Sequence, residues 1–160
     1  MPTLAEMMTT HARAGRIVWI GVRTARRGAV EPCDRAAIGE TGLLGDHRTR
    51  PGPRAVTIMQ AEHVPVIAAL AGPDARVTPE ALRRNVHVRA TNVLAYRDAV
   101  FQLGSAVLRG TGICAPCSRM TEALGQGGYN AVRGHGGITA EVVEPGEIAL
   151  GSPMRLVGGE

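Results

Sequence analysis

Glycine and proline divide this chain into short segments, and that division restricts the folds open to it. Of the 160 residues, 21 are glycine and 10 are proline. Between them lie short runs rich in β-branched and apolar residues, for example 15–22 and 54–59, a composition typical of strands. Many short strands with frequent turns suit a sandwich or barrel better than a bundle of long helices. We therefore expect a mostly β protein.

The length of the chain fits one domain. A domain of this size buries roughly 68–70% of its unfolded surface, so its core needs no disulfide. Only four residues are aromatic, namely Trp19, Tyr96, Phe101 and Tyr129. Aliphatic side chains and methionine must therefore fill the core. We expect an N-terminal tail or short helix at 1–14 and a single domain at 15–158.

Local patterns place strands and helices along this domain. Thr78 and Pro79 form a helix start, with threonine as the N-cap and proline at the first helical position. Residues 62–70 and 116–124 are also helical in pattern. Strands are expected at 15–22, 35–38, 54–59, 85–89, 101–108 (a hairpin that turns at its glycine), 138–143 and 149–157. Together these elements predict a closed β-barrel with two or three short helices.

The chain contains no lysine, so all of its 18 basic lysine-type or arginine-type residues are arginine, and the formal net charge is +4. Guanidinium groups bind phosphate and carboxylate in a planar, bidentate manner, so the composition favours an anionic ligand, although a GC-rich genome also produces many arginines. Without lysine, an internal aldimine with pyridoxal phosphate is excluded. Because the arginines are scattered and aromatic residues for base stacking are few, we do not expect a nucleic-acid partner.

Three cysteines, Cys33, Cys114 and Cys117, are an odd number for a framework of disulfides. Residues 1–16 contain no apolar region of a secretory signal, and no stretch approaches the roughly 20 apolar residues of a membrane span. We therefore expect a cytoplasmic protein without a membrane segment. In a reducing compartment its cysteines are catalytic, metal-binding or buried rather than cross-linked.

The sequence Cys114-Ala115-Pro116-Cys117 is the sharpest local feature, and it has several interpretations. A zinc site would need His135 and one further ligand to complete four. A thioredoxin-type redox pair would follow the first strand of a βαβ unit, which is missing here. An inert buried thiol is the third interpretation. We expect Cys117 to lie in the first turn of the helix at 116–124, where the helix dipole favours a thiolate that can bind a soft metal or sulfur.

Several short motifs follow one another in the order found in a known family. They are Gly-Leu-Leu-Gly-Asp at 42–46, Arg-Ala-Val at 54–56, Leu-Arg-Arg-Asn-Val at 82–86, Pro-Cys at 116–117, Gly-Gly at 136–137 and Gly-Glu-Ile-Ala-Leu-Gly at 146–151. In this order the chain resembles the MOSC domains, which are similar to the C-terminal part of molybdenum-cofactor sulfurases. The resemblance covers about residues 15–157. Relatives often carry His-Gly-Gly-Xaa-Arg where this chain has residues 49–54, and a closing Gly-Asp where it has Gly151-Ser152.

The resemblance implies a β-barrel of the MOSC type with one key cysteine, which falls on Cys117. In relatives such as the mitochondrial amidoxime-reducing component, that cysteine ligates molybdenum, and an Arg-x-Asn turn helps to hold the pterin. The matching residues here are Arg83 and Asn85. Small bacterial relatives are associated with the reduction of N-hydroxylated bases, whereas other members were proposed to carry sulfur.

Four further side chains are candidates for supporting roles. Asp46 could orient Arg54, bond a ligand or stabilise its own glycine turn, and Arg54 itself would add positive charge to a cofactor site. Arg119 could keep the Cys117 thiolate charged or remain an exposed helix residue. His135, in a glycine-rich loop, could donate protons near neutral pH or lie on the surface. Cys33 and Cys114 are expected to be structural.

Three functions remain open from the sequence. In the first, Cys117 binds a molybdenum cofactor that reduces a small molecule, with electrons from a redox partner because no flavin, haem or iron–sulfur pattern is present. In the second, Cys117 carries a persulfide supplied by a cysteine desulfurase. In the third, the barrel binds an anionic metabolite without catalysis.

Overall fold

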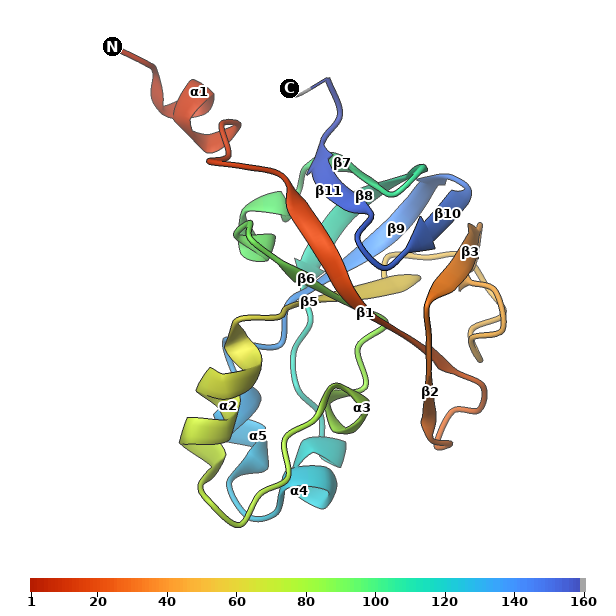
Figure 1. Cartoon of the computed structure of the whole chain (residues 1–160), viewed down its shortest axis with the longest axis vertical. Helices are drawn as coiled ribbons and strands as arrows, with labels where there is room; N and C mark the ends of the chain where they lie inside the picture. The colour runs from red at the N-terminus through yellow and green to blue at the C-terminus, as the bar shows by residue number, and fades with distance from the viewer. Residues whose placement is uncertain (159–160) are drawn as a thin grey trace.

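Seven strands close into a β-barrel in the computed structural model, which describes residues 1–158. Around the barrel the strand order is β11–β7–β8–β9–β5–β6–β1, and pairing of β1 with β11 closes the ring (Figure 1). The strands are β1 (Gly15–Arg23), β5 (Val56–Gln60), β6 (Val86–Arg89), β7 (Val100–Leu103), β8 (Ala106–Ile113), β9 (Ile138–Glu144) and β11 (Pro153–Leu156). The predicted closed barrel is confirmed.

Side chains of alternating residues fill the barrel interior. Residues such as Ile58, Val86 and Val88 are fully buried in one large apolar cluster. Tyr96, at the end of a 3₁₀ turn (Val93–Tyr96), meets Phe101 edge to face in this cluster, with ring centroids 5.4 Å apart. Side chains fill the interior of a barrel of this size. The interior is therefore a packed core, and a ligand-binding site must lie at an end of the barrel or on its outside.

One parallel pairing interrupts an otherwise antiparallel barrel. β5 and β6 run parallel, and parallel neighbours need a long crossover connection. That crossover contains α2 (His63–Ala71) and α3 (Pro79–Leu82). α3 begins as its sequence predicts, because the Thr78 hydroxyl accepts a hydrogen bond from the Ala81 amide at 3.2 Å.

A second helical excursion leaves the same end of the barrel between β8 and β9. It forms α4 (Arg119–Leu124) and α5 (Gly128–Val132), which pack against α2 and α3 below the barrel (Figure 1). A separate apolar cluster joins these helices to β5, and its buried members are Met59, Ile67, Leu82, Met120, Leu124, Ala131 and Val132. The helices therefore form a cap over one barrel end.

The remaining elements extend the barrel at its edges. β2 (Val30–Cys33) pairs with β1, and a small sheet consists of β10 (Gly146–Ala149), β3 (Arg35–Gly39) and β4 (Gly42–Leu43). α1 (Leu4–Met8) lies in the N-terminal segment, outside the barrel (Figure 1). No helix within residues 1–158 combines the length and apolar character that a membrane crossing needs.

The helices differ in number from the expectation. Five short α-helices are present among the described residues rather than two or three. α5, which the sequence did not suggest, begins at a glycine and spans only five residues. Helices this short are stabilised by tertiary packing more than by intrinsic propensity, so the sequence pattern around them is weak.

Candidate functional site

A positively charged cleft lies where the barrel meets the helical cap. Its volume is about 280 Å³, and its walls come from the end of β1, the turn after β4, the α3–β6 connection and the β8–α4 connection. Its lining carries no aspartate or glutamate. Seven arginines line it, namely Arg23, Arg26, Arg48, Arg54, Arg83, Arg84 and Arg119, together with His47, Thr57, Cys114, Ala115, Cys117 and Met120. The arrangement suits a ligand with several negative charges.

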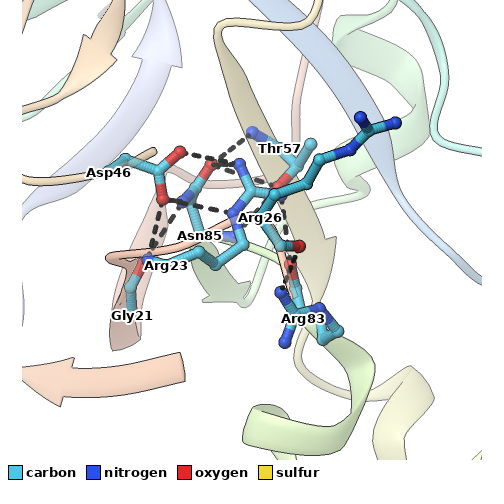
Figure 2. A network of polar contacts seen from close by, with 7 residues as sticks. All are labelled: Gly21, Arg23, Arg26, Asp46, Thr57, Arg83 and Asn85. Carbon is cyan, nitrogen blue, oxygen red and sulfur yellow. Dashed lines mark hydrogen bonds and ion pairs between the residues drawn. The ribbon is translucent and has the colours of Figure 1, made fainter. Parts of the chain in front are cut away.

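One wall of the cleft is held by the ion pair between Arg23 and Asp46 (Figure 2). The Asp46 carboxylate accepts hydrogen bonds from the Arg23 amide at 2.8 Å, from Nε at 3.2 Å and from Nη2 at 3.0 Å. Burial raises the pKa of Asp46, but these hydrogen bonds and the charge of Arg23 outweigh it and hold the pKa below its ordinary value. Asp46 thus orients Arg23 rather than Arg54.

Asn85 completes this network from inside the barrel wall (Figure 2). Its Oδ1 accepts hydrogen bonds from the amide and hydroxyl of Thr57 and from Arg23 Nη2, each at 3.2 Å. Its Nδ2 donates to the Gly21 carbonyl at 3.2 Å and to Asp46 Oδ1 at 3.3 Å. Asn85 is fully buried, so its side chain positions Arg23 and does not line the cleft.

Arg83 stands at the end of α3 in the left-handed region, with φ of 61°. Its guanidinium donates a hydrogen bond to the Arg26 carbonyl at 3.3 Å (Figure 2) and another to the Gly28 carbonyl at 2.5 Å. These bonds tie the β1–β2 loop to the cleft. Burial, then the charges of Arg119 and Arg23, lower the pKa of Arg83, and a Cys117 thiolate acts in the opposite direction. Arg83 therefore belongs to the electrostatic surroundings of Cys117.

Cys117 is exposed in the segment between β8 and α4, whereas Cys114 in the same segment is buried. The expected position of Cys117 in a first helical turn is wrong, because α4 begins at Arg119 after its N-cap Ser118. Pro116 biases Ala115 toward an extended conformation, and the helix begins only after Ser118. The charge around the thiol therefore comes from arginine side chains rather than from a helix end.

Two of the cleft arginines have unused hydrogen-bond donors. Arg48 Nε and Arg119 Nε are shielded from water and contact no acceptor within the described residues. Buried donors are ordinarily paired, so these two atoms indicate where an acceptor on a ligand would bind. His47 lies beside them, and burial followed by the charge of Arg23 lowers its pKa below 6.5, which leaves the imidazole neutral near pH 7.

The structure brings most of the expected site residues together but separates one. Cys117, Arg54, Arg83 and Arg119 line the cleft, with Arg54 at its exposed rim. His135 does not line it. Its ring packs edge to face against His63, with centroids 5.0 Å apart. Within residues 1–158 no group of three His, Cys, Asp or Glu side chains is placed to hold a metal ion.

Sequence reasoning missed five basic lining residues, namely Arg23, Arg26, His47, Arg48 and Arg84. Arg23 ends β1, and its role depends on Asp46, 23 residues further along the chain. The cluster of His47 and Arg48 directly after Asp46 was the one available sequence signal. Nothing in the local sequence around Arg83 and Arg84 indicates that Arg84 is buried.

Comparison with known proteins adds a family and several similar folds. A family model for the MOSC domain matches residues 42–155. A comparison with curated protein sequences finds no significant match.

Solved structures share this fold at low sequence identity. The YuaD protein from Bacillus subtilis has a TM-score of 0.76 and 18% identity, over 89% of this chain and 94% of that one. YiiM from Geobacillus stearothermophilus has a TM-score of 0.71 and 19% identity, with coverages of 89% and 74%. YiiM from Escherichia coli has a TM-score of 0.62 and 21% identity, with coverages of 91% and 71%.

Proposed function

The chain belongs to the MOSC domain family, and from this premise we propose that its arginine-lined cleft binds a molybdenum cofactor with Cys117 as the protein ligand to the metal. The observation that carries the proposal is the position of Cys117. It is the exposed cysteine of the chain, and it opens onto a cleft lined by seven arginines and no carboxylate. The molybdenum end of such a cofactor would bind the soft thiolate, and the phosphate at its pterin end would bind the arginines.

The residues present fit such a group. Arg48 Nε and Arg119 Nε are donors without protein acceptors, and guanidinium groups match phosphate oxygens in geometry and charge. Arg54 adds charge at the exposed rim. The Asp46 carboxylate is fully used by Arg23 and Asn85, so it does not repel an anion strongly. Arg83 and Arg119 would stabilise the Cys117 thiolate next to the bound cofactor.

The bound cofactor would supply oxygen-atom transfer, and the expected reaction is reduction of the N–O bond of a small N-hydroxylated molecule. The chain's own residues contribute binding and proton handling. His47, neutral near pH 7, can hold or release a proton at the cleft. His135 lies against His63 and takes no part in this scheme. Electrons would come from a partner protein in the cytoplasm.

A second candidate function uses the same thiol without metal. Cys117 is exposed, and a thiol that exchanges sulfur with a desulfurase must be accessible to another protein. In this alternative, Cys117 holds a persulfide and the arginines stabilise its anionic form. The cleft would then accept sulfur from one partner and release it to another.

Metal and cofactor analysis on purified protein distinguishes these functions. The protein is produced in a host that makes the cofactor, as wild type, Cys117→Ser and the control Cys33→Ser, whose thiol does not line the cleft. We expect stoichiometric molybdenum and pterin in wild type and Cys33→Ser, and loss of molybdenum in Cys117→Ser. A labile sulfur atom on Cys117 without metal would support the carrier. Absence of metal, pterin and sulfur from wild type would leave an anion-binding barrel.

A further inference from the structure

A second cavity, larger than the arginine-lined cleft, lies on another part of the molecule. Its volume is about 640 Å³, and it shares no lining residue with that cleft. Three segments distant in the chain form its walls, namely the N-terminal segment at 7–13, the junction of β5 and α2 at 60–63 and the chain after β6 at 90–95. Sites for small molecules typically have volumes of about 300–1,000 Å³, so this cavity has room for one.

A strained residue forms part of the wall of this cavity. Ala90 has φ of 76°, in the left-handed region that a residue with a Cβ atom rarely adopts. Its amide donates to Glu62 Oε2 at 2.9 Å, and its carbonyl accepts from Arg13 Nε at 3.3 Å. Unfavourable backbone conformations persist where the surrounding contacts enforce them, and they cluster at ligand sites. Here the two side chains that enforce the conformation also line the cavity.

Glu62 is the one acidic residue in the lining, and both of its carboxylate oxygens are occupied. Oε2 accepts from the Ala90 amide, and Oε1 accepts from Gln60 Nε2 at 2.8 Å. The Gln60 side chain is fixed in turn, because its Oε1 accepts from the Val93 amide at 2.8 Å. Burial raises the pKa of Glu62, but the hydrogen bonds from Ala90 and Gln60 outweigh it and hold the pKa below its ordinary value. Glu62 therefore holds the wall of the cavity as a carboxylate with two donors of its own.

Arg13 brings the opposite charge to the cavity without an acidic partner. No ion pair among residues 1–158 includes it, and its side chain is exposed. The bond from its Nε to the Ala90 carbonyl holds the guanidinium at the cavity and leaves the Nη groups for a ligand. Parallel N–H donors of a guanidinium match the two oxygens of a carboxylate.

His11 adds a second polar group to the same wall. Its ring stacks on Tyr96, with centroids 4.3 Å apart, and its Nδ1 lies 3.5 Å from the Thr91 hydroxyl. Burial lowers its pKa, so the ring is neutral near pH 7. Its Nε2 is shielded from water and has no partner within the described residues, whereas buried polar atoms are ordinarily paired. Since the Thr91 hydroxyl can donate to Nδ1, Nε2 can carry the hydrogen and donate to an acceptor from outside the chain.

Apolar side chains complete the lining. Met7 is 52% exposed and Met8 is 67% exposed, because α1 buries none of its residues. Methionine side chains are flexible and adapt to ligands of different shapes. With Ala12 and Ala95, they give the cavity an apolar part next to its single unpaired positive charge.

We propose that this cavity binds a small organic carboxylate, with the carboxylate held by Arg13 and the apolar body against Met7 and Met8. The site is separate from the arginine-lined cleft and does not depend on the proposed function. Because the unpaired charge in the cavity is positive, an anionic ligand should bind more tightly than a neutral molecule of the same shape.

The test follows backbone amide signals of the ¹⁵N-labelled full chain, produced in the cofactor-making host, by NMR during addition of phenylacetate. Phenylacetamide is the matched probe without a charge. Arg13→Gln removes the cation, and Ala95→Trp fills the cavity but keeps Arg13. The matched control is Arg16→Gln, because Arg16 is also exposed and also bonds to one backbone carbonyl at 3.3 Å, but does not line the cavity.

We expect phenylacetate to shift the signals of residues that line the cavity, with a Kd of about 1 mM or tighter. Phenylacetamide should bind wild type about tenfold more weakly than phenylacetate, and phenylacetate should bind Arg13→Gln about tenfold more weakly than wild type. Ala95→Trp should show no saturable shift, and Arg16→Gln should keep the wild-type Kd.

Several results would overturn the proposal. The absence of a saturable shift in wild type up to about 10 mM phenylacetate would do so, as would shifts confined to the arginine-lined cleft. An equal Kd for the two probes, or for wild type and Arg13→Gln, would assign the binding to apolar contacts alone. If the spectrum of Arg13→Gln shows that this variant is unfolded, Ala95→Trp decides, and unchanged binding in that variant overturns the proposal. Each of these results is independent of the metal content of the protein.

Discussion

Replacing His87 by leucine should remove a large part of the acid sensitivity of this fold. His87 lies on β6 between the core residues Val86 and Val88 in the chain, and only 1% of it is exposed. Its ring meets Trp19 edge on, with centroids 5.0 Å apart, and its Nε2 has no hydrogen-bond partner within the described residues. Burial, and then the charge of Arg84, lower its pKa from 6.5 to about 4.

The sign and size of the effect follow from that shift. Above pH 6.5 His87 is neutral in both states and contributes no pH dependence. Below pH 6.5 His87 is protonated in the unfolded chain, whereas in the folded protein it becomes protonated only near pH 4. The free energy of unfolding therefore falls as pH falls. A depression of about 2.5 units corresponds to a total loss of about 3 kcal/mol, of which about 2 kcal/mol is reached by pH 5.

Urea denaturation of wild type and His87→Leu, repeated from pH 8 to pH 4.5, measures this term. The comparison at pH 8, where His87 is neutral, gives the packing effect of the substitution and serves as the reference. Between pH 8 and pH 5 wild type should lose about 2 kcal/mol more than His87→Leu. Parallel stability curves for the two proteins over this range would show that His87 is not buried in its neutral form.

Two further substitutions test the close contacts of the fold by urea denaturation. Gly137→Ala should lower the free energy of unfolding by about 3 kcal/mol or more, because Gly137 has φ of 83° and a Cβ would collide with a β5 carbonyl. The control Gly125→Ala, with φ of 85° and open space around the Cβ, should lower it by only about 1 kcal/mol. Equal losses in the two variants would contradict the clash at Gly137. Asp46→Asn should lower the free energy of unfolding by about 3 kcal/mol near pH 7, since the Asp46 side chain is 1% exposed and its ion pair is buried. The control Glu141→Gln, which removes an exposed ion pair, should lower it by less than about 1 kcal/mol. The Asp46 contribution should disappear as pH falls through its lowered pKa, and a cost that persists at low pH would assign it to packing.

The sequence by itself determined the elements whose signals are local. A run of β-branched and apolar residues between glycines indicated β1, alternating side chains indicated β6, and a threonine followed by proline indicated the start of α3. These signals report backbone torsion preferences and the period of side chains along a strand, which neighbouring residues set. The short motifs likewise pointed to the family and to Cys117 as a candidate functional cysteine.

Only the tertiary structure decided which side chains meet at the cleft. Barrel closure brings Arg23 to Asp46 and buries Asn85 between them, which turns two expected ligand-binding residues into supports for an arginine. Folding of the glycine loop buries Arg84 among carbonyls and directs His135 to His63. These contacts join segments distant in the chain, and their geometry depends on strand register and closure of the whole barrel, which no local pattern of residues encodes.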